Sequence, residues 1–284
     1  MTLRRQLSRL SVGLVAGATP VLPAMAQQPH MWQLGFQAAQ SPVETQIHSL
    51  HNLVLVIITA IVVFVAGLLL FTLWRFSAKR HPVASRVSHN TTLEVAWTLV
   101  PVLILVGIAI PSFRLIYFED RTRDADMTIK VEGHQWYWQY SYPDQQNITF
   151  TSYPVDKNNP PPGKQRLLDV DNQLVLPAGK NIRILTTGGD VIHSFFIPSL
   201  GVQRYAIPGR TIETWVKIDR PGDYYGECNQ ICGTNHSNMP ISIHAVTPEA
   251  FAAWIPTARA KFAADSPAPA EITPATPVRL AAQP

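Results

Sequence analysis

Two long uncharged runs of apolar residues precede a region of short alternating segments. The first run extends from Leu53 to Trp74 and the second from Val95 to Phe113. Each approaches the ~20 residues that a helix needs to cross a bilayer, and Trp74 and Trp97 stand near run ends, where aromatic residues favour the interface. The pattern predicts two transmembrane helices at about 53–74 and 95–113. Two buried core helices are the alternative, which the length of the first run disfavours.

The second run contains Pro101 and Pro111. Proline would break a helix in water, but transmembrane helices tolerate it where neighbours satisfy the freed carbonyl. The loop between the runs has no acid and four bases, Arg75, Lys79, Arg80 and Arg86. By the positive-inside bias this loop faces the cytoplasm, so both ends of the mature chain face outward.

After residue 120 the pattern changes to short β-branched segments such as M-T-I-K-V-E, I-R-I-L-T-T, I-E-T-W-V-K-I and I-S-I-H-A-V. Turn signals such as P-P-P-G, P-G-R and R-P-G-D separate them, a spacing typical of an all-β sandwich or barrel. A short helix is expected from Pro248 to about Phe262, because proline is tolerated in a first turn. The Pro/Ala-rich residues that follow favour a disordered tail.

The composition agrees with membrane segments. The 284 residues are 46% hydrophobic and 15% charged, against roughly 25% charged in soluble domains. The net charge of +4 could suggest a nucleic-acid partner. However, the basic excess lies at the extreme N-terminus and between residues 75 and 86, without an aromatic-interleaved basic face, which argues against nucleic acid.

Residues 1–26 have the pattern of a secretory signal peptide: early arginines, a short apolar run, and Ala24-Met25-Ala26 as a small-x-small cleavage site. An uncleaved amphipathic anchor is the alternative, which the shortness of the run and Pro20 and Pro23 disfavour. The mature chain would begin at Gln27, outside the bacterial inner membrane. The expected domains are the signal peptide (1–26), a segment with two spans (27–118), a periplasmic domain (119–262) and a tail (263–284).

The segment C-N-Q-I-C-G-T-N-H-S-N-M places four soft groups within a dozen residues: Cys228, Cys232, His236 and Met239. His193 lies upstream in D-V-I-H-S-F-F. Thiolate, thioether and imidazole together are typical ligands of a soft transition metal, above all copper, in an electron-transfer role.

In an oxidising compartment, two cysteines usually form a disulfide. Compartment and spacing alone leave a disulfide and a metal or redox site about equally open. The turn-rich loop around Cys228 and Cys232, with His236 and Met239 inside it, favours a metal. His193 follows a β-type run and can converge from a neighbouring strand. Two thiolates can bridge a pair of copper ions, whose potential the surrounding shell and the weak Met239 thioether would tune.

The chain closely resembles subunit II of haem–copper cytochrome c oxidase, which carries a binuclear copper centre called CuA. The likeness covers nearly the whole mature sequence. Its blocks are Q-L-G-F-Q-A-A-Q-S-P (33–42), E-V-A-W-T-L-V-P (94–101), G-H-Q-W-Y-W (133–138), V-D-N-Q-L-V-L-P (170–177), A-I-P-G-R (206–210) and the cysteine loop. The resemblance implies two transmembrane helices followed by a cupredoxin-like β-barrel.

The resemblance also implies roles for individual residues. The copper ligands would be His193, Cys228, the backbone carbonyl of Gln230, Cys232, His236 and Met239. Trp136 would be the point where electrons enter from cytochrome c, although packing inside the barrel is the plainer role of a W-Y-W block. Glu94 would mark a proton-path entrance; its alternative is a helix-start acid that interacts with the helix dipole.

The sequence departs from the family pattern at several positions. Gln230 replaces a usual Glu that helps to hold magnesium at the subunit I interface, and Tyr205 replaces a common Asp. Loss of the carboxylate weakens the case for magnesium, because hard divalent ions favour charged oxygen. Ser141 and Gly189 stand where relatives often carry acids that attract cytochrome c, so weaker long-range steering is expected.

The expected function is subunit II of a proton-pumping terminal oxidase in the inner membrane. The chain would pass electrons from cytochrome c to haem in subunit I, where oxygen is reduced, and subunit III is a further expected partner. A membrane-anchored copper chaperone is the alternative, which two spans, strand-rich sequence and Met239 disfavour. A quinol-oxidase subunit would lack the cysteines, and a disulfide-pinned scaffold would leave the extra ligands unexplained.

Overall fold

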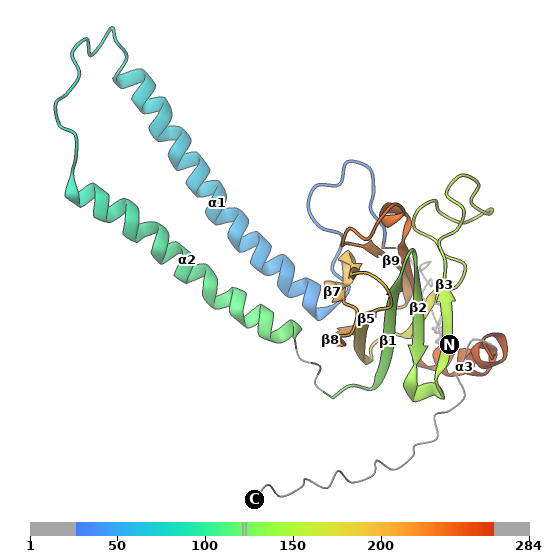
Figure 1. The fold of residues 1–284 in the computed structure, drawn as a ribbon. Helices are drawn as coiled ribbons and strands as arrows, with labels where there is room; N and C mark the ends of the chain where they lie inside the picture. Colours follow the sequence, from blue (N-terminus) through green and yellow to red (C-terminus); the bar gives the residue numbers. More distant parts are fainter. Residues whose placement is uncertain (1–26, 121, 123, 264–284) are drawn as a thin grey trace, which may run out of the picture.

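The computed structural model describes residues 27–120, 122 and 124–263 (Figure 1). Two long helices, α1 (Pro42–Arg75) and α2 (Thr91–Glu119), extend from one side of a β domain. The expected fold class, two apolar helices followed by a cupredoxin-like β domain, is confirmed. The proposed signal peptide and nearly all of the proposed tail lie outside the described residues.

Each long helix begins at a capping side chain. Ser41 Oγ accepts a hydrogen bond from the Glu44 N–H at 3.0 Å, and Asn90 Oδ1 accepts one from the Leu93 N–H at 3.1 Å. Such caps satisfy amide groups that the first turn leaves without a partner. Both helices are longer than the uncharged runs they contain, and α2 continues through both of its prolines.

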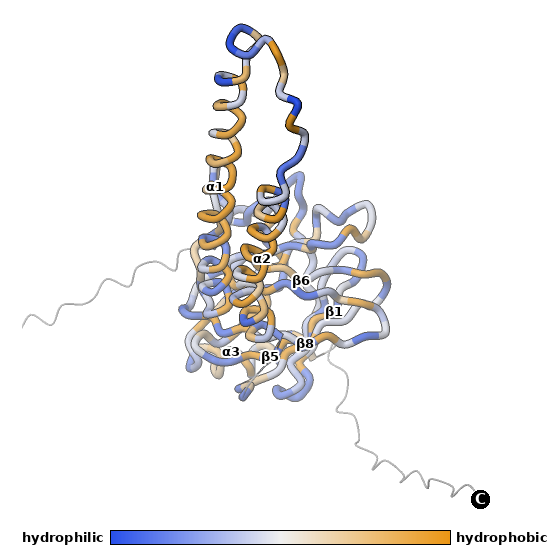
Figure 2. Tube along the Cα trace, turned by 90° about the vertical axis from the view of Figure 1, so that its left-hand side faces the viewer, coloured by the Kyte–Doolittle hydropathy of each residue, from blue (hydrophilic) through white to orange (hydrophobic). Residues whose placement is uncertain are grey.

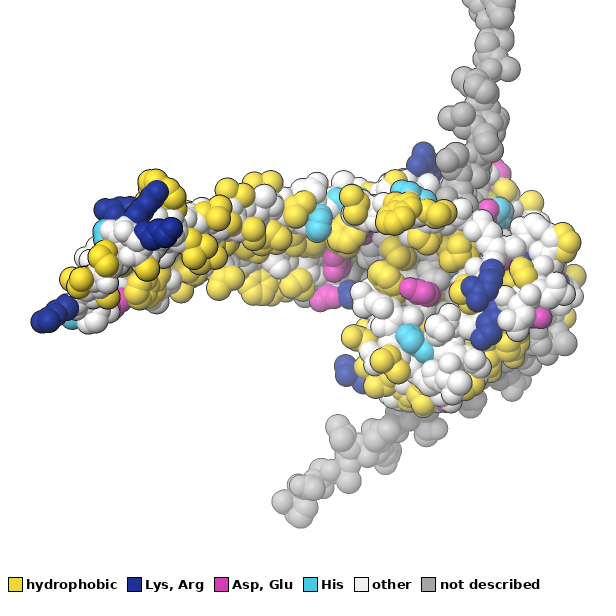
Figure 3. All heavy atoms as spheres, turned by 90° about the horizontal axis from the view of Figure 1, so that it is seen from above, with side chains coloured by type: hydrophobic (Ala, Val, Ile, Leu, Met, Phe, Trp, Pro, Cys, Tyr) yellow, Lys and Arg dark blue, Asp and Glu magenta, His cyan; other side chains and the backbone are white. Residues whose placement is uncertain are grey.

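The surfaces of α1 and α2 are those of membrane spans. Both helices are long and apolar enough to cross a membrane, and their most apolar windows have no buried residue. Figure 2 shows the two helices mostly in orange with a blue connecting loop. Figure 3 shows Lys and Arg side chains gathered at the hairpin end, away from the β domain. An apolar surface left uncovered by protein is suited to lipid.

The β domain consists of two five-stranded sheets. The first has the order β3-β2-β1-β5-β8, with β1 (Met127–His134), β2 (Tyr137–Tyr142), β3 (Ile148–Ser152), β5 (Asn181–Gly188) and β8 (Ile212–Lys217). The second has the order β4-β10-β9-β6-β7, with β4 (Leu174–Pro177), β6 (His193–Ile197), β7 (Val202–Ala206), β9 (Gly222–Cys228) and β10 (Pro240–Val246). The pairs β1–β5 and β4–β10 are parallel, and the remaining ladders are antiparallel.

The core lies between the sheets, as the alternating burial of the strands requires. Strand β2 alternates half-buried and buried positions, so that Trp138, Tyr140 and Tyr142 all point inward and are fully buried. The helix α3 (Pro248–Lys261) closes one end of the domain, as the sequence predicted. It is followed by Phe262, whose ring stacks on Phe150 at a centroid distance of 4.4 Å.

Hydrogen bonds tie both helices to the β domain. Before α1, Ser41 Oγ donates to the Leu200 carbonyl at 2.7 Å, and the Arg220 side chain donates to Gln40 at 2.6 Å. In the last turn of α2, the Phe118 carbonyl accepts a hydrogen bond from Trp215 Nε1 at 2.9 Å. Because both ends of the helix pair are held in this way, the β domain is fixed relative to α1 and α2.

Candidate metal centre

Strand pairing brings His193 and Cys228 together. His193 is the first residue of β6, and Cys228 is the last residue of β9. The two strands are paired with Phe195 opposite Cys228, and the Asn229 N–H donates to the Ser194 carbonyl at 3.1 Å. Residues far apart in sequence therefore meet at one end of the second sheet.

The loop between β9 and β10 supplies the remaining candidates. It contains Cys232, then His236 at the start of a short 3-10 helix (His236–Asn238), and Met239 immediately before β10. The Cys228 N–H donates to the Met239 carbonyl at 3.1 Å, which closes the base of the loop. Within this loop, the Cys232 side chain lies against Cys228 and the His236 side chain lies against Cys232.

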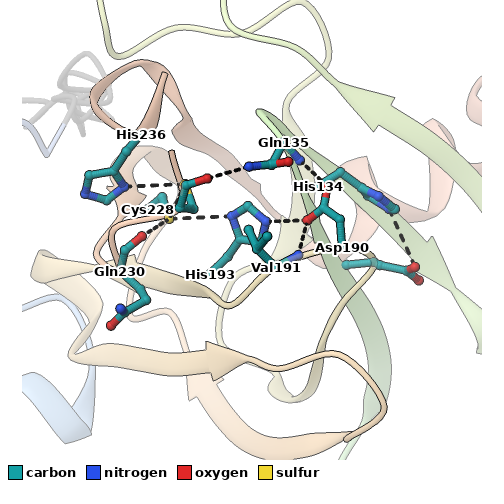
Figure 4. A network of polar contacts seen from close by, with 10 residues as sticks. His134, Gln135, Asp190, Val191, His193, Cys228, Gln230 and His236 are labelled. Atoms are coloured by element: carbon teal, nitrogen blue, oxygen red, sulfur yellow. Dashed lines mark hydrogen bonds and ion pairs between the residues drawn. The ribbon is translucent and has the colours of Figure 1, made fainter. Parts of the chain in front are cut away.

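The side-chain donors face one another at short distances (Figure 4). The sulfurs of Cys228 and Cys232 are 3.8 Å apart. His193 Nδ1 lies 3.8 Å from the Cys228 sulfur, and His236 Nδ1 lies 3.6 Å from the Cys232 sulfur. The Gln230 carbonyl oxygen is 3.3 Å from the Cys228 sulfur. Ligand atoms of His193 and both cysteines all lie within 4.8 Å of one another.

Burial and chemistry of this donor set suit a soft metal. His193 is fully buried, Cys228 and Cys232 are 3% and 5% exposed, and Met239 is 1% exposed. Both cysteines are free thiols. Sulfur and imidazole donors directed at one shared space, with water largely excluded, form the kind of site that copper or zinc prefers. The group His193, Cys228, Cys232 and Met239 is typical of CuA.

The surroundings of the two thiols shift their pKa values in opposite directions. Burial alone would raise the pKa of Cys228, but hydrogen bonds, first that with His193, bring this pKa well below its ordinary value. Burial and the neighbouring Cys228 raise the pKa of Cys232. These opposite shifts favour a thiolate at Cys228 and a thiol at Cys232 while no metal is bound. A bound cation would favour deprotonation of both.

Asp190 contacts the imidazole of His193 at the ring nitrogen opposite the one that faces Cys228. Its Oδ1 lies 2.9 Å from His193 Nε2, the ring nitrogen that faces away from Cys228. Burial alone would lower the pKa of His193, but the contacts with Cys228 and Asp190 raise it. Burial would raise the pKa of Asp190, whereas hydrogen bonds with His193 and two backbone N–H groups lower it. Asp190 is a residue for which no role was predicted from the sequence, although its place three residues before His193 is a signal that could have found it.

Gln135 joins the two halves of the site. Its backbone N–H donates to Asp190 Oδ2 at 2.7 Å, and its side chain donates to the Cys232 carbonyl at 2.7 Å. No role for Gln135 was predicted from the sequence. Gly133 allows strand β1 to lie close to His193, because a Cβ at this position would be 2.9 Å from ring carbons of the histidine. The β1–β2 turn is thereby held against both the histidine and the cysteine loop.

The two tryptophans of the W-Y-W block have different positions. Trp138 is fully buried, with its ring edge-on to His193 at a centroid distance of 6.0 Å. Trp136 is half-buried and lies over the cysteine loop, since a Cβ at Gly233 would be 3.0 Å from its ring. Packing thus accounts for Trp138, while Trp136 is half-buried against the cysteine loop.

The other residues singled out by sequence contribute no side chain to this cluster, which Gln230 enters only through its backbone carbonyl. Glu94 is in the first turn of α2, at the end of the hairpin away from the β domain (Figure 1). Tyr205 is 47% exposed on β7, and the Gln230 side chain is half-buried. Neither residue carries a carboxylate.

Comparisons with known proteins identify the family. Residues 29–115 match the family model described as "Cytochrome C oxidase subunit II, transmembrane domain", and residues 127–246 match "Cytochrome C oxidase subunit II, periplasmic domain". The chain belongs to the cytochrome c oxidase subunit II family. It is therefore a subunit of cytochrome c oxidase, and the family implies an electron-transfer role.

Individual relatives agree with this membership. The chain is 47% identical over 247 residues to a probable cytochrome c oxidase subunit 2 of Rickettsia felis, covering 87% of this chain and 78% of the relative. It is 44% identical to the Triticum aestivum subunit 2, covering 82% and 92%. A crystal structure of the periplasmic domain of the Bradyrhizobium japonicum subunit II is 46% identical, covering 50% of this chain and 99% of that one, with a TM-score of 0.47.

Proposed function

We propose that this subunit II receives electrons from cytochrome c at a binuclear copper centre and delivers them to haem in subunit I of a proton-pumping oxidase. The subunit would lie in the bacterial inner membrane with its β domain in the periplasm. The observation that carries the proposal is the buried convergence of His193 with Cys228 and Cys232, with His236 Nδ1 3.6 Å from the second sulfur.

The proposed ligands are those that the family pattern implies, namely His193, Cys228, the Gln230 carbonyl, Cys232, His236 and Met239. When bound, a copper pair would supply a one-electron relay that shares the charge between two ions. The distances around both sulfurs support this assignment. The replacement of Glu by Gln230 does not affect a ligand that comes from the backbone.

The residues around the ligands would orient them. Asp190 Oδ1 would accept a hydrogen bond from the Nε2–H of His193, which leaves Nδ1 to face Cys228. Such a carboxylate partner fixes the tautomer and the ring orientation of a metal-binding histidine. Gln135 connects the same carboxylate to the Cys232 backbone. The histidine and the cysteine loop are thereby held in fixed positions relative to each other.

Further roles follow from position. We propose Trp136, which covers the cysteine loop, as the point where electrons enter, and Glu94 as the entrance of a proton path. Subunits I and III would be the membrane partners. Magnesium at the interface with subunit I would receive no carboxylate from Gln230 or Tyr205, so we propose that this chain contributes little to such a site.

Copper loading of the full chain in detergent micelles tests the proposal. After reduction of the thiols and addition of copper, we expect two copper ions per chain and the EPR spectrum of a mixed-valence pair. Cys232→Ser should abolish that spectrum, because a copper pair would need both cysteine sulfurs as ligands. Ser242→Ala, at a buried hydroxyl on β10 outside the ligand set, is a matched control that should load normally.

Two results would contradict the proposal. One is a folded, reduced chain that binds no copper, and the other is a stable Cys228–Cys232 disulfide that persists under the loading conditions. A single bound copper with an ordinary mononuclear spectrum would also exclude the binuclear assignment.

A further inference from the structure

The segment between residues 27 and 41 forms a strap held at both ends. The Gln27 N–H donates to the Asp223 carbonyl at 2.8 Å, and the Tyr225 N–H donates back to the Gln27 carbonyl at 3.4 Å. At the other end, the Gln40 N–H donates to the Ser199 carbonyl at 2.9 Å. In Figure 1 the strap rises from the β domain as a blue loop toward the side from which α1 and α2 extend.

The strap presents large apolar side chains outward. The Gln33 N–H donates to the His30 carbonyl at 3.3 Å, which makes a turn with Met31 and Trp32 at its tip. Met31, Trp32 and Leu34 are 86%, 93% and 98% exposed. Residues 27–43 contain no Asp, Glu, Lys or Arg. Three such side chains gathered on one short uncharged loop form an apolar patch that water disfavours.

Contacts with α1 show which part of this helix the strap lies beside. The Phe36 ring lies against His48 and His51, with ring centroids 5.3 and 4.6 Å apart. His51 is two residues before Leu53, where the uncharged run begins, and each helical residue rises about 1.5 Å. Phe36 is therefore within a few ångströms of the boundary at which α1 enters the hydrocarbon.

From this placement we propose that the strap is an interfacial membrane anchor, with Met31, Trp32 and Leu34 inserted among the lipid headgroups of the periplasmic leaflet. The proposal depends on α1 and α2 spanning a bilayer and does not depend on copper. Tryptophan favours this depth because its ring is apolar while its N–H finds polar partners. The strap has no charge, so it fits lipid of any headgroup and needs no anionic one.

The anchor would give the β domain a third attachment. The two helices fix the barrel at neighbouring points, and the strap adds a contact beside them that resists tilting of the barrel. Because Gln27 pairs with β9, the strap joins the lipid surface directly to the strand that ends at Cys228.

Photocrosslinking in the assembled oxidase tests the anchor. Trp32 is replaced by p-benzoylphenylalanine in cells that make the whole complex, membranes are irradiated, and subunit II is analysed by mass spectrometry. We expect a phospholipid adduct at position 32. The matched control places the same probe at Ala253, an exposed position on α3, which Figure 1 shows on the far side of the domain from the helices; no lipid adduct is expected there.

Each other outcome overturns the proposal. An adduct only to another oxidase subunit would show that protein covers the strap. Absence of any adduct in an intact, copper-loaded complex would show that the strap faces water. A second measurement uses the full chain in bilayers of brominated lipid: the wild type should lose more tryptophan fluorescence than Trp32→Phe, and equal quenching of the two would contradict insertion.

Discussion

At the scale of single residues, the candidate centre depends on groups that are not ligands. Asp190 and Gln135 connect the His193 imidazole to the Cys232 backbone through hydrogen bonds of 2.7 to 2.9 Å. Removing the charge at Asp190 would free the ring to rotate and change its tautomer. The effect of such a change should be visible in metal affinity before it is visible in the fold.

We expect Asp190→Asn to weaken copper binding by roughly 10- to 100-fold, the usual cost of losing such a partner. Competition with a copper chelator measures the affinity. Asp223→Asn is the matched control, because Asp223 also accepts from a histidine, His244 at 2.7 Å, but on the β9–β10 pair away from the ligands. Equal copper affinity of the Asp190 variant and the wild type would show that Asp190 does not support metal binding.

The two tryptophans should respond differently to truncation. Trp136→Ala should slow oxidation of reduced cytochrome c roughly tenfold with copper content intact, because a central interface tryptophan contributes more than about 1 kcal/mol. Trp138→Ala should lower the free energy of unfolding by about 3–5 kcal/mol, as expected for a fully buried ring. Stopped-flow kinetics and denaturant titration measure these effects. Loss of copper in the Trp136 variant would show that its role is structural.

At the scale of elements, strand pairing and helix attachment decide where the site lies. The β6–β9 ladder sets His193 beside Cys228, and the β9–β10 ladder closes the cysteine loop. The bonds from Ser41 to Leu200 and from Trp215 on β8 to Phe118 in the last turn of α2 then attach the β domain to the helix pair. The position of the centre relative to the bilayer is thus determined by a few contacts at the junction.

Trp215→Phe tests one of these contacts. It keeps the ring packed on Phe118 (centroid distance 5.2 Å) and removes only the donor to the Phe118 carbonyl. We expect the free energy of unfolding of the full chain in micelles to fall by about 1 kcal/mol, the net contribution of one hydrogen bond. Tyr205→Phe, at an exposed position on β7, should change it much less. An unchanged value for Trp215→Phe would mean that water replaces the bond fully.

The Asp223–His244 pair links β9 to β10 and makes stability depend on pH. Their hydrogen bond lowers the pKa of Asp223 and raises the pKa of His244. The histidine contribution is complete below its unfolded pKa and is lost as pH rises through the folded value. The aspartate contribution is complete above its unfolded pKa and is lost as pH falls through the folded value. Both are present together only in the mildly acidic range.

Unfolding of the wild type and Asp223→Asn at several pH values checks this. The difference in free energy should be largest near about pH 5–6, at roughly 0.2–1 kcal/mol because both side chains are partly exposed. It should shrink toward about pH 9, where the histidine is neutral. A difference that grew with rising pH would contradict the assignment.

At the scale of the whole molecule, charge is divided unevenly. The loop at the hairpin end is basic, whereas residues 124–263 carry 12 Lys and Arg against 13 Asp and Glu. A balanced domain has little long-range field, so a charged partner gains little from steering. The docking of cytochrome c should therefore depend mainly on short-range contacts around Trp136.

The rate of electron transfer from cytochrome c to the whole oxidase should change little with added salt. Salt screens mainly the interactions between charges separated by more than a Debye length, about 8 Å at 0.15 M salt. The β domain has almost no net charge, so added salt has little long-range attraction to weaken. Stopped-flow rates across a series of salt concentrations measure this dependence. A steep fall with ionic strength would show that a local acidic patch guides docking in spite of the overall balance.

The sequence alone determined the order of the parts: two apolar helices, a strand-rich domain and a short final helix. Uncharged runs and alternating segments report local solvent preference, which does not depend on distant contacts. The clustering of Cys228, Cys232, His236 and Met239 was likewise local, because one turn-rich loop carries all four. Both helices begin before the apolar runs, at caps formed by Ser41 and Asn90.

Only the tertiary structure decided which distant groups support that loop. The convergence of Asp190 and Gln135 on His193 and Cys232 requires β1, β6 and β9 to meet at one end of the barrel. The different burial of Trp136 and Trp138, two residues apart in one motif, follows from which side of the turn faces the core. Phe36 against His51 sets the level of the N-terminal strap. Each depends on long-range packing, which no local pattern of residues encodes.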